Sequence, residues 1–221
     1  LASELAVKGI TDRPVLAGCI GPFSLAGRLF GISEIMLELL SAPETIHRLL
    51  EKCTDFLLTY IDAFKKKSVH GIIMAEPAAG MLSPQMCQEF SSTYIKTITD
   101  NVQDADFFII LHNCGNTNPL LACIQEAGAT GIHLGNKCDI VAALNFLDKD
   151  RLVLGNLDPA GLFLMGSGED VMQATTELLE KTSPYQNFII SSGCDIPPGT
   201  PQDNLKAFFT AVSEYNKAAH P

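Results

Sequence analysis

The sequence predicts an α/β protein in which strands and helices alternate along the chain. Six short apolar runs recur, and each is followed by a stretch with apolar residues at helical spacing. Successive runs are separated by the roughly 30 to 50 residues that a crossover between parallel strands requires. The runs are almost entirely apolar, as expected of parallel strands whose two faces are both covered.

About six βα units fit two architectures, an open doubly wound sheet and a closed barrel. A (β/α)8 barrel of the TIM type has eight strands and usually about 250 residues, whereas this chain has 221 and begins with Leu1 rather than Met. We therefore favour the barrel with its N-terminal part missing. The expected organisation is a single (β/α) barrel domain over residues 1–221, incomplete at its N-terminus.

The expected strands end in Gly, Pro or polar residues, which terminate extended structure. Five of them are expected at Pro14–Ile20, Gly71–Ala75, Thr130–Leu134, Leu152–Leu157 and Phe188–Ser192. The third strand along the chain contains His112, in an apolar run from Phe107 that ends in His112-Asn113-Cys114.

Helices are expected between these strands, and residues before Pro14 are expected to form a polar lead-in. The segment Ser41-Ala42-Pro43-Glu44 is typical of a helix start, and that helix presents an apolar face from Ile46 to Phe64. The remaining predicted helices cover Glu34–Leu40, a stretch from Ser83 through Ile98, Pro119–Gly128, Asp139–Leu147, Glu169–Lys181 and Gln202–Asn216.

Two strand ends carry side chains suited to a metal ion. His112 and Cys114 lie two positions apart, and such side chains on an extended chain point the same way. Cys194 follows another apolar run, at the end where parallel α/β sheets bind ligands. One imidazole and two thiolates suit Zn²⁺, with a fourth position left open. A lone H-x-C pattern is a weak signal, because Cys and His also occur in cores.

The composition excludes several classes of protein. A formal net charge of −10 argues against a nucleic-acid surface. No apolar run is long enough to cross a membrane. Seven cysteines, an odd number, do not form a disulfide framework in a chain of this length. A reducing, cytoplasmic location is expected, and homo-oligomerisation is left open.

Four phrases in order carry a resemblance to a known family. They are EPAAGMLSP from Glu76, LHNCGN around His112, GNLDPAGLFLMGSGEDV from Gly155, and SSGCDIPPGTPQDNLKAF from Ser191. Through them the sequence resembles the uroporphyrinogen decarboxylase superfamily, and within it the zinc-dependent methylcobamide:coenzyme M methyltransferases. The resemblance runs from about Pro14 to Asn216.

The resemblance implies an enzyme that moves a methyl group from a methylated corrinoid, carried on a small corrinoid protein, to a thiol such as coenzyme M. It implies Zn²⁺ held by His112, Cys114 and Cys194. Two alternatives stay open at this point. One is a metal-free lyase of the uroporphyrinogen decarboxylase type, and the other is a noncatalytic subunit that binds a corrinoid protein.

Residues near the three ligands are further candidates. Glu76 is expected as a fourth zinc ligand or as the base that takes the thiol proton; the alternative is a hydrogen-bonding loop residue or a charge at a helix N-terminus. Asp158, Asn113 and Asp195 are expected to line the substrate or to orient the ligands. His133, inside an apolar run, is expected to be an interior residue rather than a ligand.

Overall fold

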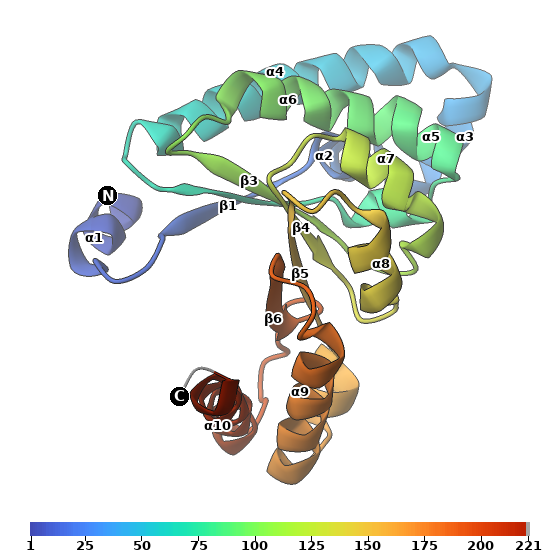
Figure 1. Ribbon diagram of the computed structural model, residues 1–221. Coiled ribbons are helices and arrows are strands. Elements are labelled where there is room, and N and C mark those ends of the chain that lie inside the picture. Colours follow the sequence, from blue (N-terminus) through green and yellow to red (C-terminus); the bar gives the residue numbers. More distant parts are fainter. Residues whose placement is uncertain (220–221) are drawn as a thin grey trace. The chain divides into compact units, whose positions relative to one another are not determined.

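A computed structural model describes residues 1–219 of the chain, in which strands and helices alternate (Figure 1). The predicted bounds of three strands are confirmed, two strands begin one or two residues later than predicted, and the predicted strand around His112 is present. The strands are β1 (Leu16–Ile20), β2 (Gly71–Ala75), β3 (Phe108–Asn113), β4 (Gly131–Leu134), β5 (Leu152–Leu157) and β6 (Phe188–Ser192).

The α-helices are α1 (Ala2–Gly9), α2 (Pro22–Phe30), α3 (Ile32–Ser41), α4 (Pro43–Lys65), α5 (Pro84–Cys87), α6 (Thr93–Val102), α7 (Leu121–Glu126), α8 (Ile140–Phe146), α9 (Gly168–Thr182) and α10 (Gln202–Ala219). Four short 3-10 or π turns are η1 (Pro77–Met81), η2 (Gln88–Ser92), η3 (Asn118–Leu120) and η4 (Pro159–Leu164). No helix was predicted before Pro14. Residues Ala2–Gly9 nevertheless form α1, which buries no residue.

The described chain divides into two compact units. The first comprises residues 1–113 and 119–132, and the second comprises residues 114–118 and those from 133 onward. Each is described below by itself, and the single-domain organisation stays a prediction.

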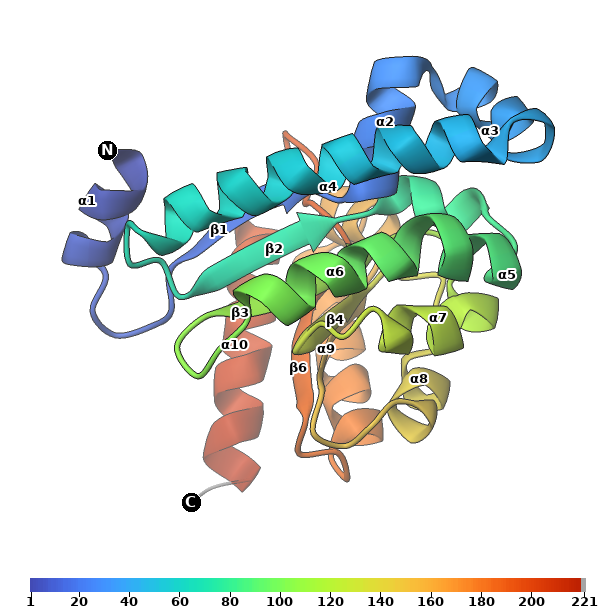
Figure 2. The same ribbon diagram turned by 90° about the horizontal axis from the view of Figure 1, so that it is seen from above.

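In the first unit, β1, β2 and β3 pair in parallel and in sequence order, with Gly71 of β2 opposite Leu16 and Phe108. The helices α4 and α6 pack side by side along these strands (Figure 2). Helix α4 buries a stripe at helical spacing, as predicted, through Ile46, Leu50, Leu57 and Ile61. Phe56, which the pattern assigned to the same face, is exposed.

The helix predicted from Ser83 is interrupted by a wider turn. Ser83 caps α5, because its hydroxyl accepts a hydrogen bond of 3.2 Å from the Met86 amide. The π turn η2 then links α5 to α6. Such turns are rare and often lie at functional sites, and this one supplies Ser91, which bonds Glu76 as described below.

In the second unit, β5 and β6 pair in parallel from Val153 opposite Phe188 to Leu157 opposite Ser192. A small core forms from Leu157, Phe163 and Val171. Helices α9 and α10 pack together, and Asn204 of α10 donates hydrogen bonds to the carbonyls of Phe163 and Gly166. These contacts fix α10 against α9 and against η4, the turn that follows β5.

Every helix within residues 1–219 is too short or too polar to span a bilayer.

Candidate metal centre

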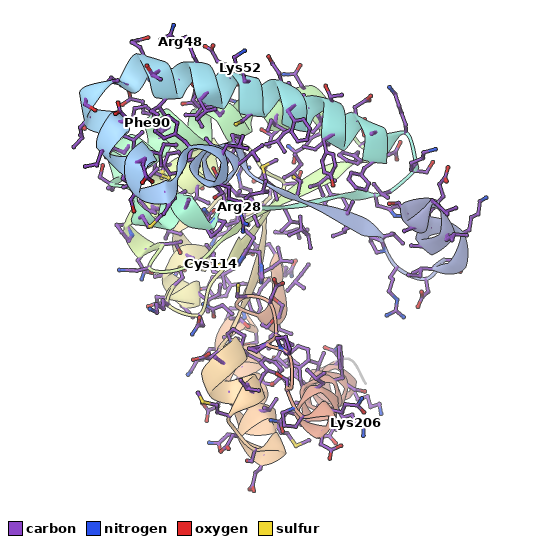
Figure 3. All side chains as sticks on the ribbon, turned by 180° about the vertical axis from the view of Figure 1, so that it is seen from behind. Arg28, Arg48, Lys52, Phe90, Cys114 and Lys206 are labelled. Carbon is purple, nitrogen blue, oxygen red and sulfur yellow. The ribbon has the colours of Figure 1, made fainter. Side chains whose placement is uncertain are left out.

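Two cysteine sulfurs of the second unit lie side by side. Cys114, in the loop after β3 (Figure 3), has its Sγ 3.4 Å from the Sγ of Cys194, which follows β6. Both cysteines are half-buried and neither is in a disulfide. Two thiolates on a tetrahedral zinc ion, each at about 2.3 Å, would lie about 3.8 Å apart. The pair therefore needs only a small opening to share one ion.

The electrostatics of the pair favour a cation. Burial, the neighbouring thiol of Cys194 and the carboxylate of Asp195 together raise the pKa of the Cys114 thiol to about 12. Two thiols at this distance resist ionising together, because the second negative charge would face the first. A divalent ion reverses this balance and holds both sulfurs as thiolates.

His112 precedes Cys114 by two residues and is the next-to-last residue of the first unit's strand β3. Its side chain is buried, and its carbonyl accepts a hydrogen bond of 2.9 Å from the Glu76 amide. Two residues of chain span at most about 7 Å, so covalent connection alone keeps the His112 backbone near Cys114. The imidazole of His112 and the thiols of Cys114 and Cys194 are a donor set compatible with zinc.

The turn that carries Cys194 is held by hydrogen bonds within the second unit. His133 Nε2 lies 2.8 Å from the Ser192 carbonyl and 3.0 Å from the Ser191 hydroxyl. The Ser192 hydroxyl in turn donates to the Cys194 carbonyl at 2.8 Å. Since a carbonyl only accepts, Nε2 carries the proton in this neutral, half-buried imidazole, whose pKa burial lowers. His133 thus steadies the backbone on which Cys194 sits.

Gly193 allows the backbone of this turn to approach a neighbouring segment closely. Its amide donates to the Leu157 carbonyl at 2.7 Å. A Cβ at this position would lie 2.5 Å from the Asn136 amide nitrogen, so only glycine fits.

Glu76 is fully buried in the first unit and binds the start of α2. Its Oε1 accepts hydrogen bonds from the Phe23 amide at 2.8 Å and the Ser91 hydroxyl at 3.1 Å, and its Oε2 accepts one from the Ser24 amide at 3.1 Å. Burial raises the pKa of Glu76 to about 7, although these three hydrogen bonds favour the ionised form. The carboxylate therefore takes the place of a helix cap, the alternative that the sequence left open.

Three other predicted site residues lie in different settings. Asn113 is buried, and its amide donates to the Glu76 carbonyl at 3.2 Å, whereas its Oδ1 has no hydrogen-bond partner. Asp158 caps η4 by accepting from the Ala160 and Gly161 amides, both at 2.9 Å, and it lines a cavity of about 430 Å³ in the second unit. Asp195 is exposed.

These features define a class of protein: a parallel α/β protein with metal-competent side chains just beyond the carboxyl ends of its strands. The chain belongs to the uroporphyrinogen decarboxylase (URO-D) family, whose model matches residues 2–215. The family resemblance drawn from the four sequence phrases is confirmed.

Curated relatives include both activities that the sequence left open. The chain is 29% identical over 206 residues to methylcobamide:CoM methyltransferase MtbA of Methanosarcina acetivorans, covering 92% of this chain and 59% of the relative. It is 28% identical over 214 residues to uroporphyrinogen decarboxylase 2, chloroplastic, of Arabidopsis thaliana, covering 93% of this chain and 53% of the relative. The chain thus spans less than two thirds of the length of these relatives.

Solved structures agree on the fold. A methyltransferase from Methanosarcina mazei superposes with a TM-score of 0.88 at 23% identity, covering 97% of this chain and 63% of that one. A B12-independent methionine synthase from Shewanella sp. W3-18-1 superposes with a TM-score of 0.72 at 13% identity, covering 99% of this chain and 66% of that one. The predicted fold class, a TIM-barrel type with about six βα units in this chain, is confirmed.

Proposed function

We propose that this chain belongs to a zinc-dependent methyltransferase that moves a methyl group from a methylated corrinoid to a thiol such as coenzyme M. The corrinoid would be presented by a partner corrinoid protein. The observation that carries this proposal is the pair of sulfurs of Cys114 and Cys194, 3.4 Å apart at strand ends. The relatives named methylcobamide:CoM methyltransferase support it.

His112, Cys114 and Cys194 are the proposed ligands of Zn²⁺. The ion would supply positive charge that lowers the pKa of a substrate thiol, which is mostly protonated at neutral pH when free. Two thiolate side chains offset the charge of a divalent ion, so a substrate sulfur in this site keeps electron density for attack. The free thiols also require a reducing compartment, such as the cytoplasm.

The reaction requires one acceptor for the thiol proton and one for the electron pair of the bond that breaks. As the sulfur forms its bond to the methyl carbon, the carbon–cobalt bond breaks and its electron pair stays on cobalt. The proton of the thiol must leave, and Glu76 is the proposed acceptor, because burial raises its pKa to about 7. The substrate site is proposed to be lined by Asn113, Asp158 and Asp195. Asn113 offers a buried Oδ1 that accepts no hydrogen bond.

The second candidate is a metal-free decarboxylase, which the family and the Arabidopsis relative favour. A decarboxylase without metal gives the paired thiols of Cys114 and Cys194 no role. This difference is why we rank the methyltransferase first.

The two candidates are separated by supplying both substrates. The protein is incubated with methylcob(III)alamin and 2-mercaptoethanesulfonate, and the methyl thioether is measured by mass spectrometry; a parallel sample receives uroporphyrinogen. We expect thioether from the wild type and from Cys138→Ala, a buried cysteine of the same unit, and almost none from Cys194→Ala. Uroporphyrinogen turnover without thioether, or full activity in Cys194→Ala, would contradict the proposal.

A further inference from the structure

Helix α4 carries a row of aromatic residues beside the apolar stripe that it buries. Phe56 and Tyr60 lie one turn apart in this row and are 57% and 40% exposed. Their rings stack with centroids 5.9 Å apart and planes inclined by 18°. Phe64, one turn further on, meets the Tyr60 ring edge-on with centroids 5.0 Å apart. The first unit therefore presents ordered aromatic rings at its surface.

A groove between α2 and α4 adjoins this row, and we call it the α2–α4 groove. Its volume is about 380 Å³, and both helices belong to the first unit and pack against each other. Isolated exposed apolar side chains are common on proteins, whereas a group of them around one groove marks a binding surface. The groove is lined by Leu25 and Leu29 of α2 and by Leu49, Lys52, Cys53 and Phe56 of α4.

Two positive charges lie beside the apolar part of the groove. Arg48 precedes Lys52 by four residues, and Lys52 precedes Phe56 by four, so all three follow one side of α4 (Figure 3). Both cations are exposed, and neither forms an ion pair within residues 1–219. On a chain with a net charge of −10, they give this groove a positive margin.

We infer that the α2–α4 groove binds an acidic amphipathic helix of a partner protein. The apolar stripe of that helix fills the groove, since amphipathic helices bind apolar grooves through side chains at helical spacing. Its carboxylates lie near Arg48 and Lys52, which lack acidic partners of their own. This docking needs neither zinc nor methyl transfer, and it is independent of the proposed function.

A second copy of this chain fits the groove less well than an acidic partner does. Two copies most commonly meet through a two-fold axis, which places the same surface on both sides of the interface. An interface centred on the groove would then bring the Arg48 and Lys52 side chains of the two copies together. Repulsion between these like charges disfavours self-association through this surface.

Designed peptides of about 18 residues, stapled to hold a helix about 27 Å long, test the inference. Two of them share a leucine stripe, which is flanked by glutamates in one and by lysines in the other. The third has the composition of the glutamate peptide in scrambled order and so lacks the stripe. Fluorescence anisotropy measures their binding to the whole chain. We expect the glutamate peptide to bind about 10-fold or more tightly than either of the others.

Substitutions then place the bound peptide on the groove. Phe56→Ser should weaken binding of the glutamate peptide about 10-fold or more, as expected for an aromatic anchor. The matched control is Phe146→Ser, which alters a phenylalanine of α8 that is 54% exposed and should leave binding unchanged. Lys52→Glu should weaken binding of the glutamate peptide and strengthen binding of the lysine peptide. Lys8→Glu, at an exposed lysine of α1, is the control for charge.

Several results would overturn the inference. They are equal binding of the glutamate and scrambled peptides, tighter binding of the lysine peptide, no binding at about 1 mM peptide, and wild-type affinity in Phe56→Ser. Sedimentation of the chain alone tests the rival occupant. A dimer that Phe56→Ser dissociates would assign the groove to a second copy and would overturn the inference as well. Circular dichroism checks that each variant keeps the fold, as expected for substitutions at exposed positions.

Discussion

The Sγ atoms of Cys114 and Cys194 lie 3.4 Å apart although eighty residues separate them in the sequence. Each cysteine lies just beyond the end of a strand. The turn that carries Cys194 is held by hydrogen bonds from the Ser192 hydroxyl and the Gly193 amide. The fold of the second unit therefore brings two soft ligands together from distant parts of the sequence. This preorganisation is the basis of the predictions that follow.

Oxidation should link the two cysteines in protein freed of metal, because their sulfurs are already near contact distance. We expect diamide treatment to protect Cys114 and Cys194 from subsequent alkylation, and prior addition of zinc to prevent the disulfide. Peptide mass spectrometry measures both. Cys138, buried in the same unit, serves as the control and should alkylate equally with and without diamide after denaturation. Identical alkylation of Cys114 and Cys138 after diamide would contradict the pairing.

Removing the His133 imidazole should loosen the Cys194 turn. In His133→Phe the Ser192 carbonyl loses the partner now at 2.8 Å. Changes in residues that orient metal ligands typically cost 10-fold to 100-fold in affinity, and we expect roughly that loss in zinc affinity. Competition with a chromophoric chelator measures it, with circular dichroism to confirm that the fold is retained. His70→Phe, a histidine of the first unit, is the control; an equal loss there would point to a general effect of losing a histidine.

Glu76 should make stability fall as the pH rises. Its pKa is raised from 4.5 to about 7 in the folded protein, chiefly by burial. Between these values the unfolded chain releases the proton while the folded chain keeps it, so the free energy of unfolding decreases with rising pH. From pH 5 to pH 8 we expect the wild type to lose roughly 2 kcal/mol more than Glu76→Gln does. Urea unfolding at both pH values measures this difference; parallel pH profiles of the two proteins would contradict it.

Much of the fold could be predicted because its signals are local. The apolar runs of β2, β5 and β6 are bounded by Gly, Pro or polar residues, so their ends coincide with the prediction. Helix α1 was missed because it is only eight residues long and its residues Ala2, Leu5 and Ala6 make a short apolar stripe that no core contact reinforces, since the helix buries no residue. The π turn η2 was missed because one wide turn barely alters the spacing of apolar residues.

The candidate site, too, could be predicted from the sequence only in part. The sequence predicted the ligands His112, Cys114 and Cys194, because a short segment is enough to show both the residue type and its position at a strand end. The partners of Glu76 could not, since Phe23 and Ser91 lie 53 and 15 residues away. The His133 contact with Ser192 spans 59 residues.

The most direct test of the account is the zinc content of the purified chain, measured by elemental mass spectrometry under reducing, chelator-free conditions. Wild type, Cys114→Ala and Cys194→Ala are compared with Cys138→Ala, which removes a buried thiol of the same unit. We expect about one zinc ion per chain in the wild type and the control, and little in the two ligand variants. A wild type without metal, or Cys194→Ala with full zinc, would contradict it.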